Sequence, residues 1–85
     1  VLMILTEVEK VSINYKKPNQ QDLSLITVAE AEKYIEEGHF AKGSMLPKIQ
    51  AILKFMELGG RQALITDPEH IMEALQGKTG TWIVP

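Results

Sequence analysis

The residues best suited to chemistry lie in the stretch Gly43–Lys48, where a glycine-containing loop leads into an apolar helical pattern. The first turn of a helix holds unpaired backbone N–H groups and a partial positive charge, and both favour an anion. Ser44 is a residue type that caps helices, Pro47 is tolerated in a first turn, and Lys48 adds a full charge. This combination predicts a phosphate site. An ordinary capped helix with a solvated lysine is the alternative.

A second polar stretch, Thr6–Lys10, follows the apolar run Val1–Leu5. The run has the pattern of a strand covered on both faces, which indicates a parallel or central strand. In open α/β sheets, ligands bind just beyond the carboxyl ends of the strands. We therefore expect this turn and the start of the helix to face each other across one crevice. Tyr15 is expected to provide an aromatic wall there for a purine, with the phosphates near Lys48.

Other kinds of active site are not indicated. The absence of cysteine excludes a disulfide framework, thiolate catalysis and cysteine-ligated metal. His39 and His70 stand alone without a metal-ligand pattern, and we interpret each as a surface histidine beside a helix. Neither the Gly-x-x-x-x-Gly-Lys-Ser/Thr nor the Gly-x-Gly-x-x-Gly signature of nucleotide sites occurs. We predict no metal ligand in this chain.

Composition is that of one small soluble globular domain, with 85 residues, 45% of them hydrophobic and 24% charged. The net charge is −2 and the nine basic residues are spread out, so we expect neither a nucleic-acid nor a membrane partner. No run approaches the ~20 apolar residues of a membrane span and no secretory signal is recognisable, which favours the cytoplasm. Because Val1 already lies in a strand pattern, we interpret residues 1–85 as a single partial domain.

The pattern predicts an α/β fold with a mostly parallel sheet covered by helices, in the order β-β-α-α-β-α-β. Strands are expected at 1–5, 11–15, 61–66 and 81–84, and helices at about 28–37, at about 45–58 and from Asp67 to Gly77. Thr27 and Glu30 should form a capping box, and Asp67 should cap the last helix. The final strand–helix–strand unit is expected to be a right-handed parallel crossover.

Several of these segments together carry a family resemblance: Ile4–Val11, Ile13–Tyr15, Lys17–Gln20, Gly38–Lys48 and Gly80–Ile83. In this order they resemble the C-terminal part of the carbamate kinases, a branch of the amino-acid kinase family, over essentially the whole chain. The pair Ile-Asn-x-x-Lys-Pro and Gly-Ser-Met-x-Pro-Lys is fairly specific. Acetylglutamate, glutamate and uridylate kinases share a Thr-Asp-Val turn and a Gly-x-Met-x-x-Lys motif, but usually lack the Ile-Asn-x-x-Lys-Pro segment.

The resemblance implies the three-layer α/β/α amino-acid kinase fold, with this chain as part of the nucleotide-binding lobe. It implies phosphoryl transfer between carbamoyl phosphate and ADP, giving ATP and carbamate, with Mg²⁺. The implied catalytic residue is Lys48, which would neutralise the phosphoryl oxygens. The other implied site residues are Gly43, Ser44 and Met45 beside the phosphates, and Thr6, Val8 and Tyr15 around adenine and ribose.

The sequence departs from the family at Glu7 and Glu9, where aspartate is more common. The extra methylene keeps the charge while allowing the turn to shift. The family's N-terminal lobe, which would bind carbamoyl phosphate or carbamate, has no counterpart here. We therefore expect the chain alone to be inactive, and to pair with another copy as a homodimer through exposed strand edges. Three alternatives remain: another amino-acid kinase acting on a carboxylate, a nucleotide-binding module without catalysis, and a structural α/β domain that binds neither nucleotide nor anion.

Overall fold

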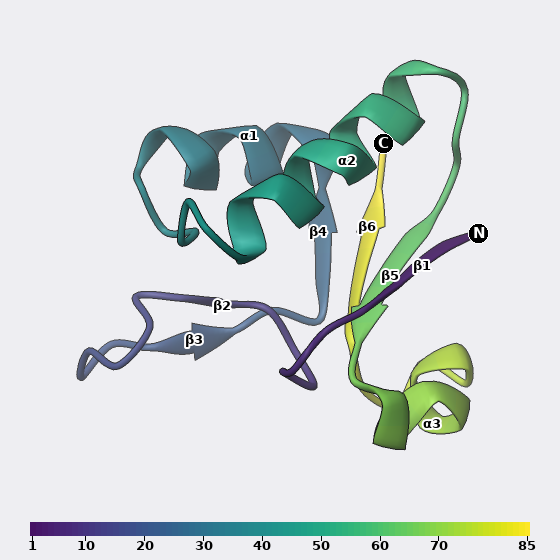
Figure 1. Cartoon of the computed structure of the whole chain (residues 1–85), viewed down its shortest axis with the longest axis horizontal. Helices are drawn as coiled ribbons and strands as arrows, with labels where there is room; N and C mark the ends of the chain where they lie inside the picture. Colours follow the sequence, from purple (N-terminus) through teal and green to yellow (C-terminus); the bar gives the residue numbers. More distant parts are fainter.

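A four-stranded sheet organises the computed structural model, which describes residues 1–85 (Figure 1). The strand order is β1-β5-β6-β4. The strands are β1 (Leu2–Leu5), β4 (Leu25–Thr27), β5 (Ala63–Thr66) and β6 (Thr81–Val84). β1 runs parallel to β5 and β4 parallel to β6, whereas β5 and β6 are antiparallel. The predicted α/β fold with a mostly parallel sheet is therefore confirmed.

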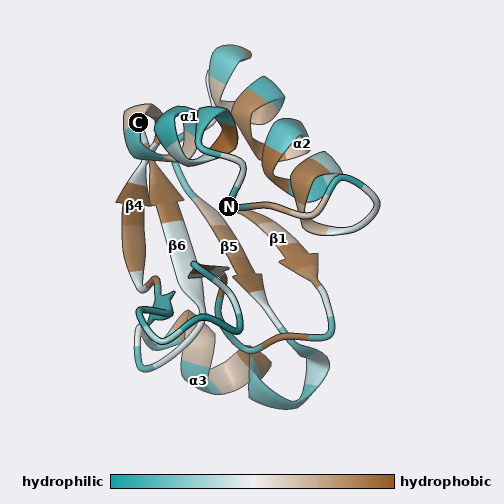
Figure 2. Ribbon diagram, turned by 90° about the vertical axis from the view of Figure 1, so that its left-hand side faces the viewer, coloured by the Kyte–Doolittle hydropathy of each residue, from teal (hydrophilic) through white to brown (hydrophobic).

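The two long helices, α1 (Val28–Glu36) and α2 (Met45–Glu57), cover one face of the sheet. Their bounds agree with the prediction to within one residue. The α2 side chains of Ile49 and Ile52 are fully buried, and they share the core with Ile65 and Ile83 of the sheet. Figure 2 shows β1 and β4 largely in the brown of hydrophobic residues, while much of α1 carries the teal of hydrophilic ones. None of the helices is long and apolar enough to cross a membrane.

A third helical segment lies against the other face of β5. It begins as the short 3-10 helix η1 (Pro68–His70) and continues as α3 (Ile71–Leu75). Because side chains alternate along a strand, Leu64 points away from the face that Ile65 shares with α2. Gly80 lies between Leu64 and Ala74, has φ +78°, and a Cβ there would come within 2.9 Å of the Leu64 side chain. Glycine is therefore required at this turn, which joins α3 to β6.

The connection between β5 and β6 corrects one prediction, because these strands are antiparallel and form no parallel crossover. The physical reason is the path of the chain between the two strands. Gly80, with φ +78°, turns the chain beside Ala74 and Ile65. Thr81, the first residue of β6, therefore pairs with Ile65 near the end of β5, and the chain returns antiparallel to that strand.

The amino-terminal half differs from the prediction in three places. β1 was expected to be covered on both faces, but it is an edge strand with Leu2 to Ile4 half-buried and Leu5 exposed. The strand predicted over 11–15 is reduced to β2 (Ser12–Ile13), which pairs with β3 (Gln21–Asp22) in a separate antiparallel sheet. β3 and β4 were missed. Strands of two or three residues are too short to show alternation, and β4 stops directly at the Thr27 cap.

Candidate functional site

A cavity lies between the carboxyl end of β1 and the N-terminus of α2. Its volume is about 1170 Å³, larger than the ~300–1,000 Å³ typical of small-molecule sites. The two polar stretches singled out in the sequence, Thr6–Lys10 and Gly43–Lys48, contribute to its walls. All seven predicted site residues line it: Thr6, Val8, Tyr15, Gly43, Ser44, Met45 and Lys48.

The side chain of Lys48 is part of the wall of this cavity. Its ammonium Nζ donates a hydrogen bond to Thr6 Oγ1 at 2.5 Å, in a partly buried contact between the first turns of α2 and the turn after β1. An ammonium has three donors, so one hydrogen bond to a hydroxyl leaves two for oxygen atoms of a ligand. The arrangement therefore holds a cation in a fixed place at the wall of the cavity.

The N-terminus of α2 is less capped than expected. Ser44 occupies the capping position, but its side chain makes no capping hydrogen bond, so the predicted cap is wrong. The reason is its backbone, which has φ −140° and ψ −79° instead of the extended conformation of a cap. The N–H of Leu46 donates to Ala41 O at 2.9 Å and Pro47 has no N–H, whereas the N–H of Met45 has no partner. A donor and the positive end of the helix therefore remain available to an anion.

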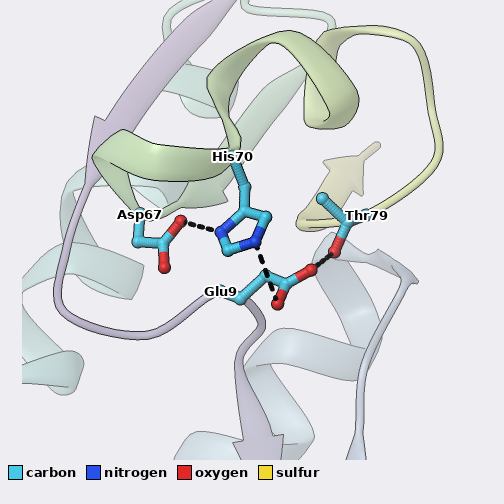
Figure 3. A network of polar contacts seen from close by, with 4 residues as sticks. All are labelled: Glu9, Asp67, His70 and Thr79. Atoms are coloured by element: carbon cyan, nitrogen blue, oxygen red, sulfur yellow. Dashed lines mark hydrogen bonds and ion pairs between the residues drawn. The ribbon is translucent and has the colours of Figure 1, made fainter.

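Another wall of the cavity, at the end of β5, contains the carboxylates of Asp67 and Glu69. Asp67 was expected to cap the last helix, but its side chain makes no capping bond to the backbone. Its Oδ1 instead lies 2.5 Å from Nδ1 of His70. On the other side of the ring, His70 Nε2 lies 3.7 Å from Glu9 Oε1, and Thr79 donates its hydroxyl to the same carboxylate of Glu9 (Figure 3).

His70 is thus part of a polar network and is not the plain surface histidine that the sequence indicated. The hydrogen bond to Asp67, with the negative charges of Asp67, Glu9 and Glu73, raises the pKa of His70 above its ordinary value of 6.5, against the effect of burial. The local signals were Asp67, three residues before His70, and Glu73, three residues after it. The contribution of Glu9 is long-range in sequence and had no such signal.

His39 also has a defined place at the cavity. Its Nδ1 accepts a hydrogen bond from the backbone N–H of Asn14 at 3.2 Å, and its Nε2 lies 3.1 Å from Glu37 Oε1. Nδ1 must therefore be unprotonated, with the ring hydrogen on Nε2 directed to Glu37. The contact supports Asn14 in a left-handed conformation with φ 53°, directly before Tyr15. The side chain is only 15% exposed, so the interpretation as a plain surface histidine is corrected here too.

Tyr15 is the most exposed of the predicted site residues with a large side chain, at 58%. The ammonium of Lys16 lies 5.5 Å from the centre of its ring. An exposed aromatic face beside a cavity is suited to stacking with a flat ring. No group of three or more His, Cys, Asp or Glu side chains is placed to hold a metal ion.

Comparison with known proteins gives consistent matches. The model of the Amino acid kinase family matches residues 1–67. The chain is 55% identical over 83 residues to the carbamate kinase of Trichomonas vaginalis, which covers 98% of this chain and 26% of that protein. It is 51% identical over 84 residues to the carbamate kinase-like protein YahI of Escherichia coli K12, covering 99% of this chain and 27% of that protein. The chain thus spans about a quarter of the length of these relatives.

Among solved structures, the chain also matches carbamate kinases. A carbamate kinase from Giardia lamblia bound to AMP-PNP superimposes with a TM-score of 0.91 and 43% identity, covering 98% of this chain and 26% of that one. A second structure of Giardia carbamate kinase superimposes with a TM-score of 0.86 and 41% identity, covering 98% and 28%. The likeness therefore includes nearly all of the sheet, the helices and the cavity walls described above.

Proposed function

The chain belongs to the amino acid kinase family, and from this premise we propose that it is the nucleotide-binding part of a carbamate kinase-like phosphotransferase. The proposed reaction transfers a phosphoryl group between carbamoyl phosphate and ADP, giving ATP and carbamate. The observation that carries the proposal is the contact of 2.5 Å between Lys48 Nζ and Thr6 Oγ1, which holds a cation at the cavity wall. Resemblance to a carbamate kinase solved with AMP-PNP supports an adenine nucleotide as the ligand.

In this proposal Lys48 is the catalytic residue. Phosphoryl transfer asks little covalent chemistry of a protein, but it requires that the phosphates be positioned and that their charge be neutralised. Lys48 does this from the first turns of α2, at the positive end of the helix dipole. Gly43, Ser44 and Met45 border the phosphates, and the free N–H of Met45 supplies a hydrogen bond.

In this proposal the nucleoside extends from Thr6, which Lys48 contacts, toward Val8 and Tyr15. Thr6 and Val8, in the turn after β1, and Tyr15, at the β2–β3 hairpin, line the space for adenine and ribose. Val8 is half-buried and gives an apolar surface, while the exposed Tyr15 ring gives a stacking surface. Most of the specificity for the base would then come from shape and a few backbone groups.

The second substrate is assigned to residues outside this chain. The chain spans about a quarter of its relatives' length, and the carbamoyl phosphate or carbamate site is proposed to lie in the remaining part. The chain by itself should then bind nucleotide without catalysing transfer. The cytoplasm is proposed as the site of this reaction.

Magnesium, which the resemblance implies, has no site of its own among these residues. No cluster suited to a metal ion is present, and Asp67 at the cavity is already engaged by His70. Mg²⁺ in nucleotide sites is commonly held through the substrate's phosphates. We therefore propose that Mg²⁺ would enter with the nucleotide, and we assign it no ligand from this chain.

We also propose a homodimer formed through the edges of the sheet. β1 and β4 are the two edge strands, and Leu5 and Leu25 on them are 45% and 64% exposed. Unpaired backbone groups along such edges favour pairing with another strand. Light scattering of the purified chain should give twice the monomer mass, and a stable monomer at high concentration contradicts this proposal.

Calorimetry with ADP tests the nucleotide site directly. Lys48→Ala should weaken ADP binding about 10- to 100-fold, as expected for the loss of a charged hydrogen bond worth ~1.5–3 kcal/mol. The matched control is Lys54→Ala on the same helix, where the side chain is 68% exposed and its ammonium pairs only with Glu57, at 3.8 Å. Lys54→Ala should leave the affinity unchanged. Equal effects of the two substitutions, or no ADP binding by the wild-type chain, would exclude the proposed site.

The choice of substrate is tested in the complete parent protein. A carbamate kinase makes ATP from carbamoyl phosphate and ADP, whereas a kinase acting on a carboxylate, such as acetylglutamate, does not. ATP formation with carbamoyl phosphate but no phosphorylation of acetylglutamate supports the proposal. The reverse result favours the alternative amino-acid kinase.

A further inference from the structure

The turn Thr6–Lys10 is fastened to the rest of the molecule from two sides. On one side Thr6 receives the hydrogen bond from Lys48. On the other side the carboxylate of Glu9 receives the hydroxyl of Thr79 and faces His70 (Figure 3). The same turn carries Thr6 and Val8, which line the cavity, so the position of Glu9 affects the shape of the proposed nucleotide site.

The ring of His70 lies between two carboxylates that come from different strands. Asp67, directly after β5, lies 2.5 Å from Nδ1, and Glu9, in the turn after β1, lies 3.7 Å from Nε2. A neutral imidazole has one N–H and one lone pair, so it can donate to only one of them. An imidazolium donates its Nδ1–H to Asp67 and directs its positive charge and its Nε2–H toward Glu9, with which it forms an ion pair. The geometry therefore selects the protonated ring.

The charges that act on the ring are all negative. Asp67 comes from the end of β5, Glu9 from the turn after β1, and Glu73 from α3. They raise the pKa of His70 above its ordinary value, with the Asp67 hydrogen bond as the largest cause and burial opposing it. The protonated ring therefore contributes its full stabilisation of the folded state when the pH lies below the pKa of His70 in the unfolded chain, near 6.5. This stabilisation is lost as the pH rises through the higher pKa of His70 in the folded state.

We propose that His70 is a positioning residue whose protonation ties the Thr6–Lys10 turn to the end of β5 and thereby tightens nucleotide binding in the cavity. The inference rests on the function proposed above and adds a regulation by pH to it. When the ring loses its proton, Nδ1–H still donates to Asp67, but a lone pair on Nε2 faces the Glu9 carboxylate. Glu9 is then held by Thr79 alone, and the turn that carries Thr6 and Val8 loosens.

The experiment measures the dissociation constant for ADP between pH 5.5 and 8.5 by calorimetry. At the acidic end of this range, wild type should bind ADP about two- to fivefold more tightly than His70→Gln does. This is the effect expected of a solvent-accessible ion pair. Glu9→Gln should also flatten the dependence of ADP affinity on pH, as His70→Gln does, without altering η1 or α3. The phosphates of ADP also titrate, but their contribution is common to all variants and cancels in the ratio. Glu57→Gln, at an exposed pair on α2, is the control and should keep the wild-type profile.

If His70→Gln does not fold, a second measurement still tests the inference. NMR titration of the wild-type chain should show the amide signals of residues 6–10 shifting together with the His70 ring. Glu9→Gln and Asp67→Asn should each lower the pH at the midpoint of the His70 titration. If these amides do not follow His70, or if the ADP profiles of wild type and Glu9→Gln coincide, the inference is wrong while the nucleotide site stands. If wild type binds no ADP at any pH, both the site and the inference fail.

Discussion

The two long helices begin in opposite ways. At α1, Thr27 Oγ1 accepts the N–H of Glu30 at 3.1 Å, and Glu30 Oε1 accepts the N–H of Thr27 at 2.9 Å. At α2, the Ser44 side chain makes no such bond and the N–H of Met45 has no partner. The first end is closed by its own side chains, and the second is open toward a cavity that also holds Lys48.

This difference shows how a helix end can serve either stability or binding. A closed end satisfies its donors locally, which stabilises the fold and leaves nothing for a ligand. An open end leaves donors and the helix dipole for an anion, at a cost in local stability. Departures from local rules are expected at functional sites, and α2 departs where α1 does not. The following substitutions test this contrast.

Lys48→Ala in the complete parent protein should have the largest effect. Removal of an electrostatic donor to a transition state costs about 2.7–4 kcal/mol, so kcat for ATP formation should fall about 10²- to 10³-fold. Stability should change little, because the contact that is lost is one partly buried hydrogen bond. Steady-state kinetics with Lys54→Ala as the reference measures the effect. If Lys48→Ala keeps the wild-type kcat, the proposed role of the open start of α2 in binding and catalysis is contradicted.

Thr27→Ala should have the next largest effect, and on stability alone. Loss of a capping side chain costs about 0.5–2 kcal/mol of unfolding free energy. Neither Thr27 nor Glu30 lines the cavity, so ADP affinity should stay at the wild-type value. Urea denaturation and calorimetry provide the two readouts. Weakened ADP binding with unchanged stability would contradict the role assigned to this helix end.

Ser44→Ala should have the smallest effect on stability, within about 0.5 kcal/mol, because there is no capping bond to lose. The matched pair Thr27→Ala and Ser44→Ala compares the same kind of substitution at the two capping positions. Urea denaturation of both variants, side by side, gives the difference. If the two variants lose equal stability, α2 is capped as well as α1 and the contrast disappears.

Much of the fold follows from patterns within a few residues. The Thr27 capping box, the buried stripe of Ile49 and Ile52, and the buried strand β5 were predicted correctly. The antiparallel pairing of β5 with β6 was not, because pairing direction depends on the length and path of the chain between them. For the candidate site, the seven predicted residues line one cavity. His39 and Asp67 also line it and were not expected there. The contacts of His39 with Asn14 and of His70 with Glu9 join distant parts of the chain and had no local signal.

The sequence by itself determined the bounds of α1 and α2 to within one residue, the positions of β5 and β6, and that a lysine lies near the start of α2. These features can be predicted from the sequence because they follow from residue types and hydrophobic spacing within short stretches of the chain. Only the tertiary structure decided that Lys48 meets Thr6, that Glu9 faces His70, and that β1 lies at an edge. Such contacts join segments that are distant in the chain, and their geometry is set by how the sheet and helices pack together.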